Sequence, residues 1–596
     1  MTCQQPAATI RSLAVLYGSQ TGTAEDVAEW ICQGAKRRHF LTTLLALDEF
    51  PLQSLSTFGA VVFVCSTTGQ GEEPDNMKKS WKLLLRRNLP SDLLASVSVA
   101  VLGLGDSAYT KFNFAAKKLY RRLLQLGAEA LVPIGLADDQ HELGIDATVE
   151  PWLSSLWDIL LERFPLSPSE TVIPDSQLLP SKYQLQWLSD QTSDSLHELT
   201  EQTEELLKAS YTLVPLLAND RLTPSSHFQD TRLISLDTSG SRDLSYRPGD
   251  VLVVLPENLE ETGQEFCDLL ELDSKSVFRI QTRDSNDASS GSIVLSVGQC
   301  LRFWWDLQSP PKRTFFRLLA NIATDELEKE KLEELSSAAG QEDLYSYCFR
   351  PRRTVVETLR DFPKTTGAIP FEYLFDLIPR IKPRSFSIAS SVECHQTVLQ
   401  ILVAVVSYKT KLQKPRQGLC STWLSRLRPG ELRIPVKIRS GSIKFPDPAR
   451  PCILVGPGTG IAPFRSYLSQ RLLIGRPTAE TWLYFGCRNR RSDFYFEREW
   501  ENQKNRLNLR TAFSRDQPEK IYVQHLLKSD GGVLWPILQR SDSYFLIAGS
   551  ANQMPKDVIA GLKEIFEIHG GLSTEEADRY FENMEKCNRF QMETWS

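Results

Sequence analysis

One loop near the N-terminus has the composition of a phosphate-binding site. In VLYGSQTGTAEDVAEW, which begins at Val15, an apolar strand-like run passes into a helix-like run through Ser19 to Thr23. Backbone N–H groups and the positive end of the helix dipole would face an anion in that loop. A nucleoside-triphosphate loop requires a Lys that is absent here, so we expect one phosphate monoester. A Ser/Thr-rich helix cap explains the loop equally well when it is taken alone.

Two further Gly-rich loops follow apolar runs of the same kind. They are STTGQGEEPDN from Ser66 and GLGDSAYTKFN from Gly103. In open α/β sheets a ligand binds beyond the carboxyl ends of the strands, so the three loops should converge on one site. A flat aromatic ligand with a phosphate tail would fit there.

The elements that must position these loops alternate between residue 12 and about residue 160. Continuous apolar runs, including AVVFVC from Ala60 and VSVAVLGLG from Val97, are separated by amphipathic helical patterns. Such runs are typical of parallel strands buried on both faces. We predict a doubly wound parallel sheet.

These segments resemble the flavodoxin family, in which they hold FMN. The resemblance implies that Ser19 to Thr23 take the phosphate and that Tyr109 stacks on the ring, while Thr68 stands where relatives often carry a second aromatic. A core tyrosine is the alternative reading of Tyr109. The residues implied for FMN are Ser19, Gln20, Thr21, Gly22, Thr23, Ala24, Ser66, Thr67, Thr68, Gly69, Leu104, Gly105, Asp106, Tyr109, Asn113 and Asp139.

The remainder of the chain has short alternating strands with Pro/Gly turns, which predict a β-barrel, and then a second α/β pattern. Three motifs, RSFSIASS from Arg384, GLCSTWL from Gly418 and GPGTGIAPFR from Gly456, resemble in order and spacing the ferredoxin-NADP reductase family. The resemblance implies an FAD site, followed by a site for a nicotinamide dinucleotide at Thr459. The FAD candidates are Arg384, Ser385, Phe386, Ser387, Gly418, Leu419, Cys420 and Ser421, with Arg352 or Arg353 of RPRRT as additional candidates.

A basic, hydroxyl-bearing cluster lies in FSRDQPEKIYVQ. Arg and Lys can neutralise a 2'-phosphate, whereas NAD carries only a hydroxyl at that position, so we expect NADPH rather than NADH. A solvated surface pair is the alternative. The residues expected at NADPH, besides Thr459, are Ser514, Arg515, Lys520, Ile521, Tyr522, Val523, Gln524 and Asp557.

The last residues, FQMETWS, place an aromatic side chain where chain ends usually fray. In the reductase relatives the corresponding aromatic covers the FAD ring and moves aside for nicotinamide, which makes Trp595 the expected gate. The relatives also surround the reacting atoms with a Ser, a Cys and an Asp. The matching residues here are Ser387, Ala548 and Glu593, so we expect catalytic roles for Ser387, Glu593 and Trp595, and a slower step for lack of the thiol.

Length and composition agree with several domains in one soluble chain. The chain has 596 residues, of which 41% are hydrophobic, which exceeds what one core usually supports. A net charge of -6 disfavours nucleic acid as a partner. Eleven cysteines without a C-x-x-C pair, no signal-peptide pattern and no apolar run long enough for a membrane span indicate a reduced, cytoplasmic protein.

The expected fold class is therefore multidomain: a flavodoxin-like doubly wound parallel sheet, then a ferredoxin-NADP reductase-like β-barrel with a helical insert and a C-terminal nucleotide-binding α/β domain. The expected boundaries are 1–160 for the FMN domain, 161–205 for a linker with one short helix, 206–447 for the barrel with its helical insert at about 262–380, and 448–596 for the NADPH domain. No metal site is expected, and the oligomeric state is not predicted.

This order resembles the diflavin reductase family, which passes electrons from NADPH to FAD, then through FMN to a one-electron acceptor. We expect neither a membrane anchor nor a haem oxygenase domain, which sets the chain apart from the microsomal and nitric oxide synthase branches, and its linker is shorter than the hinge of methionine synthase reductase. DDQHELG, SHFQDTRLI, RPRRT and ETWS are most similar to the branch that reduces the iron–sulfur protein anamorsin in cytosolic iron–sulfur assembly. Another acceptor within the family, or a non-catalytic scaffold, are the alternatives.

Overall fold

The computed structural model describes residues 11–68, 71–109, 111–188, 193–241, 244–283, 292–473, 480–503 and 505–595, with the side chains of 193–196 left aside. Gly69, one of the residues expected at FMN, lies outside these ranges. Contacts divide the chain into two units. The first comprises Met1–Leu196, Glu261–Leu301 and Trp305–Arg380, and the second comprises His197–Glu260, Arg302–Trp304 and Ile381–Ser596.

The first unit begins with a parallel sheet of order β2-β1-β3-β4-β5, with β6 also beside β4. This is the strand order of flavodoxin-like doubly wound sheets. Its strands are β1 (Ser12–Gly18), β2 (Leu41–Ala46), β3 (Ala60–Ser66), β4 (Ser98–Gly105), β5 (Glu129–Ala130) and β6 (Gly135–Asp138). The helices are α1 (Thr23–Arg37), α2 (Lys78–Leu84), α3 (Phe114–Gln125) and α4 (Asp146–Arg163).

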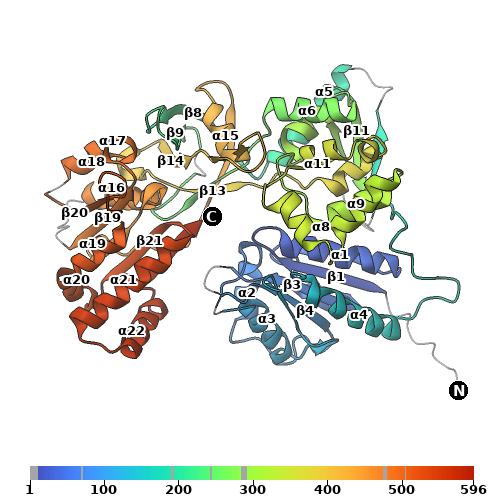
Figure 1. The fold of residues 1–596 in the computed structure, drawn as a ribbon, viewed down its shortest axis with the longest axis horizontal. Helices are drawn as coiled ribbons and strands as arrows, with labels where there is room; N and C mark the ends of the chain where they lie inside the picture. The colour runs from blue at the N-terminus through green and yellow to red at the C-terminus, as the bar shows by residue number, and fades with distance from the viewer. Residues whose placement is uncertain are drawn as a thin grey trace. The chain divides into compact units, whose positions relative to one another are not determined.

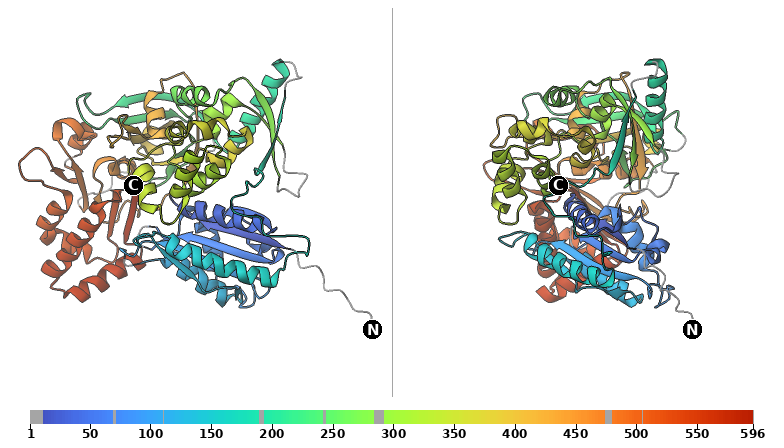
Figure 2. Two further views of the ribbon diagram at one scale, coloured as in Figure 1. Left: turned by 45° about the vertical axis from the view of Figure 1, so that its right-hand side comes forward. Right: turned by 90° about the vertical axis from the view of Figure 1, so that its right-hand side faces the viewer.

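Helices cover both faces of this sheet (Figures 1 and 2), and alternate residues of its strands enter two separate cores. Val15 and Val62 pack with residues of α1 and α4, whereas Leu16 and Phe63 pack with residues of α2 and α3. Because successive side chains of a strand point to opposite faces, a continuous apolar run fills both cores. The prediction of a doubly wound sheet is confirmed.

The rest of the first unit is mostly helical. The first of its helices, α6, begins at Glu260, one residue before this part of the unit. The main helices are α6 (Glu260–Leu270), α7 (Val297–Gln299), α8 (Arg313–Ile322), α9 (Glu326–Ser336), α10 (Gln341–Leu344), α11 (Val355–Asp361), α12 (Pro363–Gly367) and α13 (Leu374–Leu377). We call this region the helical insert. The insert also holds β11 (Val277–Thr282) and β12 (Ile293–Ser296), and its centre is the fully buried Trp305, whose ring contacts Phe266, Phe371 and Phe375.

Residues 161–205 contain more regular structure than one short helix. Strand β7 (Tyr183–Trp187) pairs with β11, and α5 (Ser193–Lys208) has sixteen residues. The Trp187 ring lies 5.5 Å from Phe278 and 4.8 Å from Phe371. A lone five-residue strand has no local signature of its own, because its partner strand and its ring contacts come from residues about 90 and 180 positions later.

The second unit opens with an antiparallel sheet of order β13-β10-β17-β8-β9-β14. Its strands are β8 (Thr212–Arg221), β9 (Thr231–Asp237), β10 (Val251–Val254), β13 (Arg384–Ser387), β14 (Val398–Ala404) and β17 (Arg433–Arg439). An isolated bridge between Ile388 and Ile401 links its two outer strands. That link closes the sheet into the predicted barrel, filled by Leu252, Ile434 and Trp423 among others.

A second parallel sheet, of order β20-β19-β18-β21-β22, completes this unit. The strands are β18 (Cys452–Val455), β19 (Thr481–Cys487), β20 (Asn508–Phe513), β21 (Tyr544–Ser550) and β22 (Phe590–Trp595). Around them and the barrel lie α14 (Val392–His395), α15 (Leu419–Arg426), α16 (Ile461–Leu473), α17 (Arg490–Asp493), α18 (Glu497–Asn502), α19 (Val523–Ser529), α20 (Gly531–Leu538), α21 (Gln553–Gly570) and α22 (Thr574–Lys586), with a small β15 (Ser407–Tyr408) and β16 (Arg416–Gln417) pair. Among the described residues, no helix combines the length and the apolar character that crossing a membrane would need.

Candidate cofactor sites

The loop from Ser19 to Thr23, which we call the phosphate loop, ends at the N-terminus of α1. Gly22 occupies the capping position with φ of 95°, a left-handed conformation that favours glycine. No side chain of a described residue caps the helix. The Gly22 N–H donates to the Ser19 hydroxyl at 3.0 Å, and the first-turn N–H groups that follow are the ones a helix leaves without intrahelical partners. The loop therefore fits an anion such as the FMN phosphate.

Hydrogen bonds join this loop to the loop after β3, and that second loop to the end of strand β4. The Asn76 carboxamide oxygen accepts from the Ser19 N–H at 2.8 Å, and the Gln20 carboxamide oxygen accepts from the Asp75 N–H at 3.0 Å. Thr67 N–H donates to the Leu104 carbonyl at 3.2 Å. The structure thus brings together the three loops that the sequence placed at one edge of the sheet. Asn76 was not among the expected residues, since nothing in its local sequence marks it.

The candidates for the ring of FMN differ in accessibility. Tyr109 is 52% exposed, so it is not a core tyrosine. The Thr67 hydroxyl accepts from the Ala115 N–H at 3.3 Å, and Ser66 donates to the Gly18 carbonyl at 3.3 Å. Thr68 closes a turn with Glu72. Apart from Tyr109, these residues would meet a ring mainly through the backbone.

Two polar candidates lie next to the ends of β4 and β6. Asn113 is fully buried, and its amide donates to the Ala137 carbonyl at 3.0 Å while its oxygen has no partner among the described residues. Asp139 donates its N–H to the Gly105 carbonyl at 2.9 Å. Desolvation, together with the negative charges of Asp106 and Asp138, raises the pKa of Asp139. The rim of this site is therefore acidic.

Helix α8 of the insert packs beside α1 (Figure 1). The Thr314 hydroxyl donates to the Asp26 carboxylate in the first turn of α1. Burial raises the pKa of Asp26, although Thr314, Lys312 and Arg317 favour the charged form and Glu29 opposes it. An ionised Asp26 is thus a cost to the folded state that its neighbours offset only in part.

We expect Asp26→Asn to raise the melting temperature at about pH 8, and to raise it less as the pH is lowered to about 5. The contribution of a carboxyl whose folded pKa is raised is fully present below its unfolded pKa and is lost as the pH rises through the folded one. Asn does not ionise, so it escapes that loss, and its oxygen still accepts from Thr314. Thermal melts across this range test the expectation. Asp158→Asn, at an exposed position of α4, is the control, and a gap that is constant with pH would contradict it.

The FAD candidates of the second unit lie on β13 and at the start of α15. Arg384 and Ser385 are exposed, whereas Phe386 and Ser387 are half-buried. Gly418 caps α15, and the side chains of Leu419, Cys420 and Ser421 are buried. Because no side chain of a described residue caps this helix, its first N–H groups fit a pyrophosphate, and those three residues can offer only backbone.

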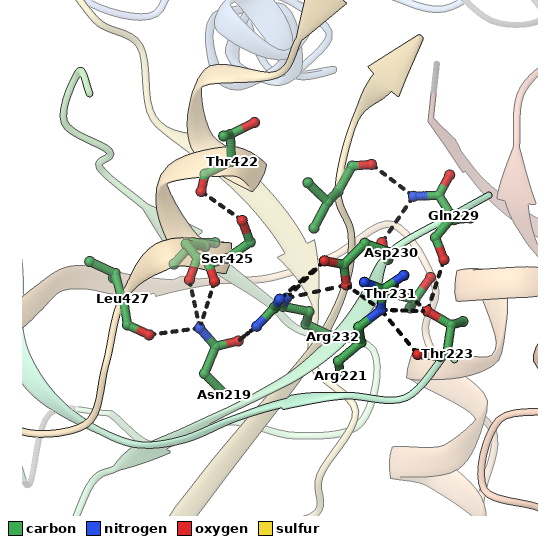
Figure 3. Close-up of polar contacts among 12 residues, drawn as sticks. Asn219, Arg221, Thr223, Gln229, Asp230, Thr231, Arg232, Thr422, Ser425 and Leu427 are labelled. Atoms are coloured by element: carbon green, nitrogen blue, oxygen red, sulfur yellow. Dashed lines mark hydrogen bonds and ion pairs between the residues drawn. The ribbon is translucent and has the colours of Figure 1, made fainter. Parts of the chain in front are cut away.

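The other end of α15 is held by a polar cluster on β8 and β9 (Figure 3). The Asn219 amide donates to the carbonyls of Leu424, Ser425 and Leu427 at 3.0, 3.3 and 2.8 Å. Arg232 donates to the Asn219 oxygen at 3.4 Å and pairs with Asp230 at 3.1 Å. Helix C-termini leave carbonyls unsatisfied, so Asn219 fixes the position of α15. Sequence reasoning did not identify Asn219.

Arg352 and Arg353 belong to the first unit, whereas the other FAD candidates belong to the second. The Arg353 guanidinium lies 4.3 Å from the centre of the Tyr347 ring, donates to the Tyr347 carbonyl at 3.1 Å and pairs with Asp361 at 2.5 Å. Arg352 has a positive φ of 53°. Within the first unit, the Arg353 charge is thus already engaged.

Thr459 lies in a 3-10 turn, Gly458–Gly460, between β18 and α16. A Cβ on Gly460 would lie 2.0 Å from the Ala548 carbonyl oxygen, so only glycine permits this close approach of the turn to β21. The Thr459 side chain is half-buried at the carboxyl end of β18. In a parallel sheet that is where a dinucleotide binds.

The basic cluster lies between β20 and α19. Arg515, Lys520 and Tyr522 are exposed, and no partner of the Arg515 or Lys520 side chain is found among the described residues. Ile521 is half-buried. In contrast, Ser514 and Val523 are buried, and Gln524 donates to Asp557 at 3.3 Å. The structure therefore leaves two cations accessible for an anionic ligand and uses the other residues to shape the loop.

The residues expected around the reacting atoms meet at the last strand. Ser387 donates to Glu593 Oε1 at 2.7 Å, and the Ser442 hydroxyl and N–H donate to Glu593 Oε2 at 2.8 and 3.1 Å. Glu593 pairs in register with Ala548, and Trp595 pairs with Ser550. Trp595 ends the strand, 36% exposed. Ser442, which holds the carboxylate in place, was not anticipated from the sequence.

We expect Glu593→Gln to slow reduction of bound FAD by NADPH about tenfold or more while FAD stays bound. A carboxylate accepts from all three donors, whereas the amide nitrogen of Gln accepts from none, so Ser387 or Ser442 loses its partner. Stopped-flow absorbance at the flavin band measures the rate. Glu431→Gln, at an exposed carboxylate of the same unit, should leave it unchanged, and equal rates in both variants would contradict the role.

Three protein-family descriptions match the chain: Flavodoxin at residues 15–152, FAD binding domain at 205–423, and Oxidoreductase NAD-binding domain at 454–559. A Xenopus laevis protein is 48% identical, with 98% of this chain and 100% of the relative covered. Relatives from Bos taurus, at 47%, and Arabidopsis thaliana, at 36%, each align with 98% of this chain and 99% of their own length. All three are named NADPH-dependent diflavin oxidoreductase 1.

These matches confirm the expected fold class, with flavodoxin-like, FAD-binding and nucleotide-binding domains in that order. They also confirm the cofactors: FMN binds the flavodoxin domain, FAD the second domain and NADPH the third. Bound flavins and nicotinamide supply the redox chemistry, and the protein supplies binding, orientation and charge. The chain belongs to the NADPH-dependent diflavin oxidoreductase family.

Proposed function

We propose that this enzyme delivers electrons from NADPH, through FAD and FMN, to the iron–sulfur protein anamorsin during cytosolic iron–sulfur cluster assembly. The proposal includes a cytoplasmic location and the cofactor contacts assigned above to individual residues. It is supported by the resemblance of the chain, in segments such as DDQHELG and SHFQDTRLI, to the branch with this role.

The observation that carries the proposal is an acidic face at the FMN site. Glu72, Asp139 and Glu142 are exposed in the loops that follow β3 and β6, and Asp138 is half-exposed beside them. Glu73 and Asp75 of the same loops pair with Lys118 and Lys78. Accessible carboxylates around the exit for electrons would attract a partner with a basic patch and increase its rate of encounter.

The experiment is anaerobic reduction of oxidised anamorsin by NADPH with a catalytic amount of this protein. The rate is measured from the loss of visible absorbance of the iron–sulfur cluster. Cytochrome c, which accepts electrons with little selectivity, serves as the control for an active flavin chain. We expect anamorsin to be reduced and its rate to fall as salt screens the acidic face. The protein should release FAD and FMN in equal amounts.

Two results would contradict the proposal in different ways. Rapid reduction of cytochrome c or of a haem monooxygenase without reduction of anamorsin would point to another acceptor of the same electron chain. Folded protein that holds FAD but not FMN and reduces neither acceptor would instead disagree with the electron route through both flavins.

A further inference from the structure

The phosphate loop contains neither Lys nor Arg, yet a lysine from a distant part of the sequence lies against it. Lys312 Nζ donates to the Thr21 carbonyl at 3.4 Å. A Cβ on Gly22 would lie 3.6 Å from Lys312 Cε and 3.9 Å from Nζ. Both loop residues flank the uncapped N-terminus of α1. The ammonium group is thus next to the site where the first-turn N–H groups of α1 would donate to an anion.

Contacts of the neighbouring residues fix the position of Lys312, which immediately precedes α8. Arg313 pairs with Asp146 at the start of α4 and donates to the Ser337 carbonyl at 3.1 Å. Thr314 donates to Asp26. The Arg317 guanidinium lies 4.1 Å from the centre of the Trp30 ring. Three residues of α8 therefore hold it against α1 and α4 and keep Lys312 beside the loop.

Two partly buried guanidinium groups, those of Arg313 and Arg317, lie at this contact. Burial, with the nearby Arg317 as a smaller cause, lowers the pKa of Arg313 to about 10. Arg317 Nη1 is buried without a hydrogen-bond partner among the described residues. Of the carboxylates nearby, Asp26 has its own pKa raised by burial. The carboxylates of Asp26, Asp146 and Glu150 already face these two groups, so what favours an anion at the N-terminus of α1 is the position of the Lys312 ammonium beside the loop.

We propose that Lys312 binds the phosphate of FMN, and so completes from the helical insert a phosphate site that the flavodoxin domain leaves without a cation. A charge-assisted hydrogen bond to a phosphate oxygen is stronger than the present one to a neutral carbonyl. By linkage, FMN then stabilises the packing of α8 on α1, and that packing increases the affinity for FMN by the same factor.

The test compares FMN with riboflavin, which carries the same ring and ribityl chain but no phosphate. Flavin affinity is measured by fluorescence titration of the full-length protein after removal of FMN, with FAD retained. For Lys312→Ala we expect FMN to bind about 10-fold to 100-fold more weakly and riboflavin to bind with unchanged affinity. Lys312→Arg should retain most of the FMN affinity, because Arg also pairs with phosphate.

Lys364→Ala is the matched control, since Lys364 is an exposed lysine of the same insert that pairs with Asp325. FMN should also raise the melting temperature of the wild type more than that of Lys312→Ala. Unchanged FMN affinity in Lys312→Ala would overturn the proposal. Equal weakening of FMN and riboflavin would overturn it as well, because the lysine would then act on the fold and not on the phosphate. Lys312→Gln, which keeps most of the stem, provides the same comparison if the alanine variant is unstable.

Discussion

Replacement of Arg515 and Lys520 together by Ala is expected to lower kcat/KM for NADPH about 100-fold to 1,000-fold and to change that for NADH by no more than about threefold. Both side chains are exposed beside α19, and no partner of either is found among the described residues. Each can form a charge-assisted hydrogen bond to the 2'-phosphate. NADH lacks that phosphate, so its binding does not depend on them. Initial rates of cytochrome c reduction with each nucleotide measure the two constants.

A double variant at Lys563 and Lys586 is the matched control. These lysines are in the same domain and pair with Asp578 and Glu582, so Lys563→Ala with Lys586→Ala removes the same net charge elsewhere. We expect the control to keep its preference for NADPH. Equal losses with both nucleotides in the Arg515 and Lys520 variant would show that these residues support the fold or the common part of the dinucleotide.

The sequence predicted the parallel sheets well because their signals are local. A run such as AVVFVC from Ala60 fills two cores with alternate residues, so apolar character alone identifies a buried parallel strand. The three loops proposed to bind FMN follow from the same signal, since they are the loops at the carboxyl ends of those strands. Tyr109 lies in one of these three loops, which is why the sequence could single it out, and its exposure agrees with a role at a ligand.

Other parts of the sites depend on contacts between residues that are far apart in the chain. Ser387 and Glu593 are 206 residues apart, and only the resemblance to a known family associated them. Asn219 reaches the end of α15 across a separation of about 205 residues. Its own surroundings read as an ordinary strand. Strand β7 is similar, since its partner β11 lies about 90 residues later.

Lys312 illustrates the same limit. PKRTFFR reads as the start of an amphipathic helix, and nothing in it points to residues 19–23, which are 291 residues away at the Thr21 contact. The loop itself, however, has the hydroxyls and the helix start of a phosphate site and no cation. Backbone N–H groups and hydroxyls can hold a phosphate monoester without a cation, so the sequence of the loop gives no reason to look for one, and only the fold brings Lys312 to it.

Trp595→Ala is expected to raise kcat/KM for NADH about 10-fold to 100-fold and thereby to reduce the preference for NADPH by about the same factor. In the reductase relatives the corresponding aromatic covers the FAD ring, and nicotinamide must displace it. We expect Trp595 to cover the ring here as well, so that its displacement would cost the same for both nucleotides, while NADPH would compensate through contacts of its 2'-phosphate, which NADH lacks. Removing the indole therefore benefits NADH more. The backbone of the strand is retained, since the Trp595 carbonyl that accepts from Ala551 N–H at 2.8 Å is unaffected.

Trp595→Phe separates the covering role from the presence of this particular side chain. A phenyl ring still stacks on a flat ligand, so this variant should keep most of the preference for NADPH. The content of FAD should be equal in the wild type, Trp595→Ala and Trp595→Phe. Combining Trp595→Ala with Arg515→Ala adds a further distinction. If the indole and the guanidinium act on different parts of the dinucleotide, the first change should raise NADH efficiency to the same extent in both backgrounds. An unchanged ratio of NADPH to NADH efficiency in Trp595→Ala would show that the last strand does not gate nicotinamide.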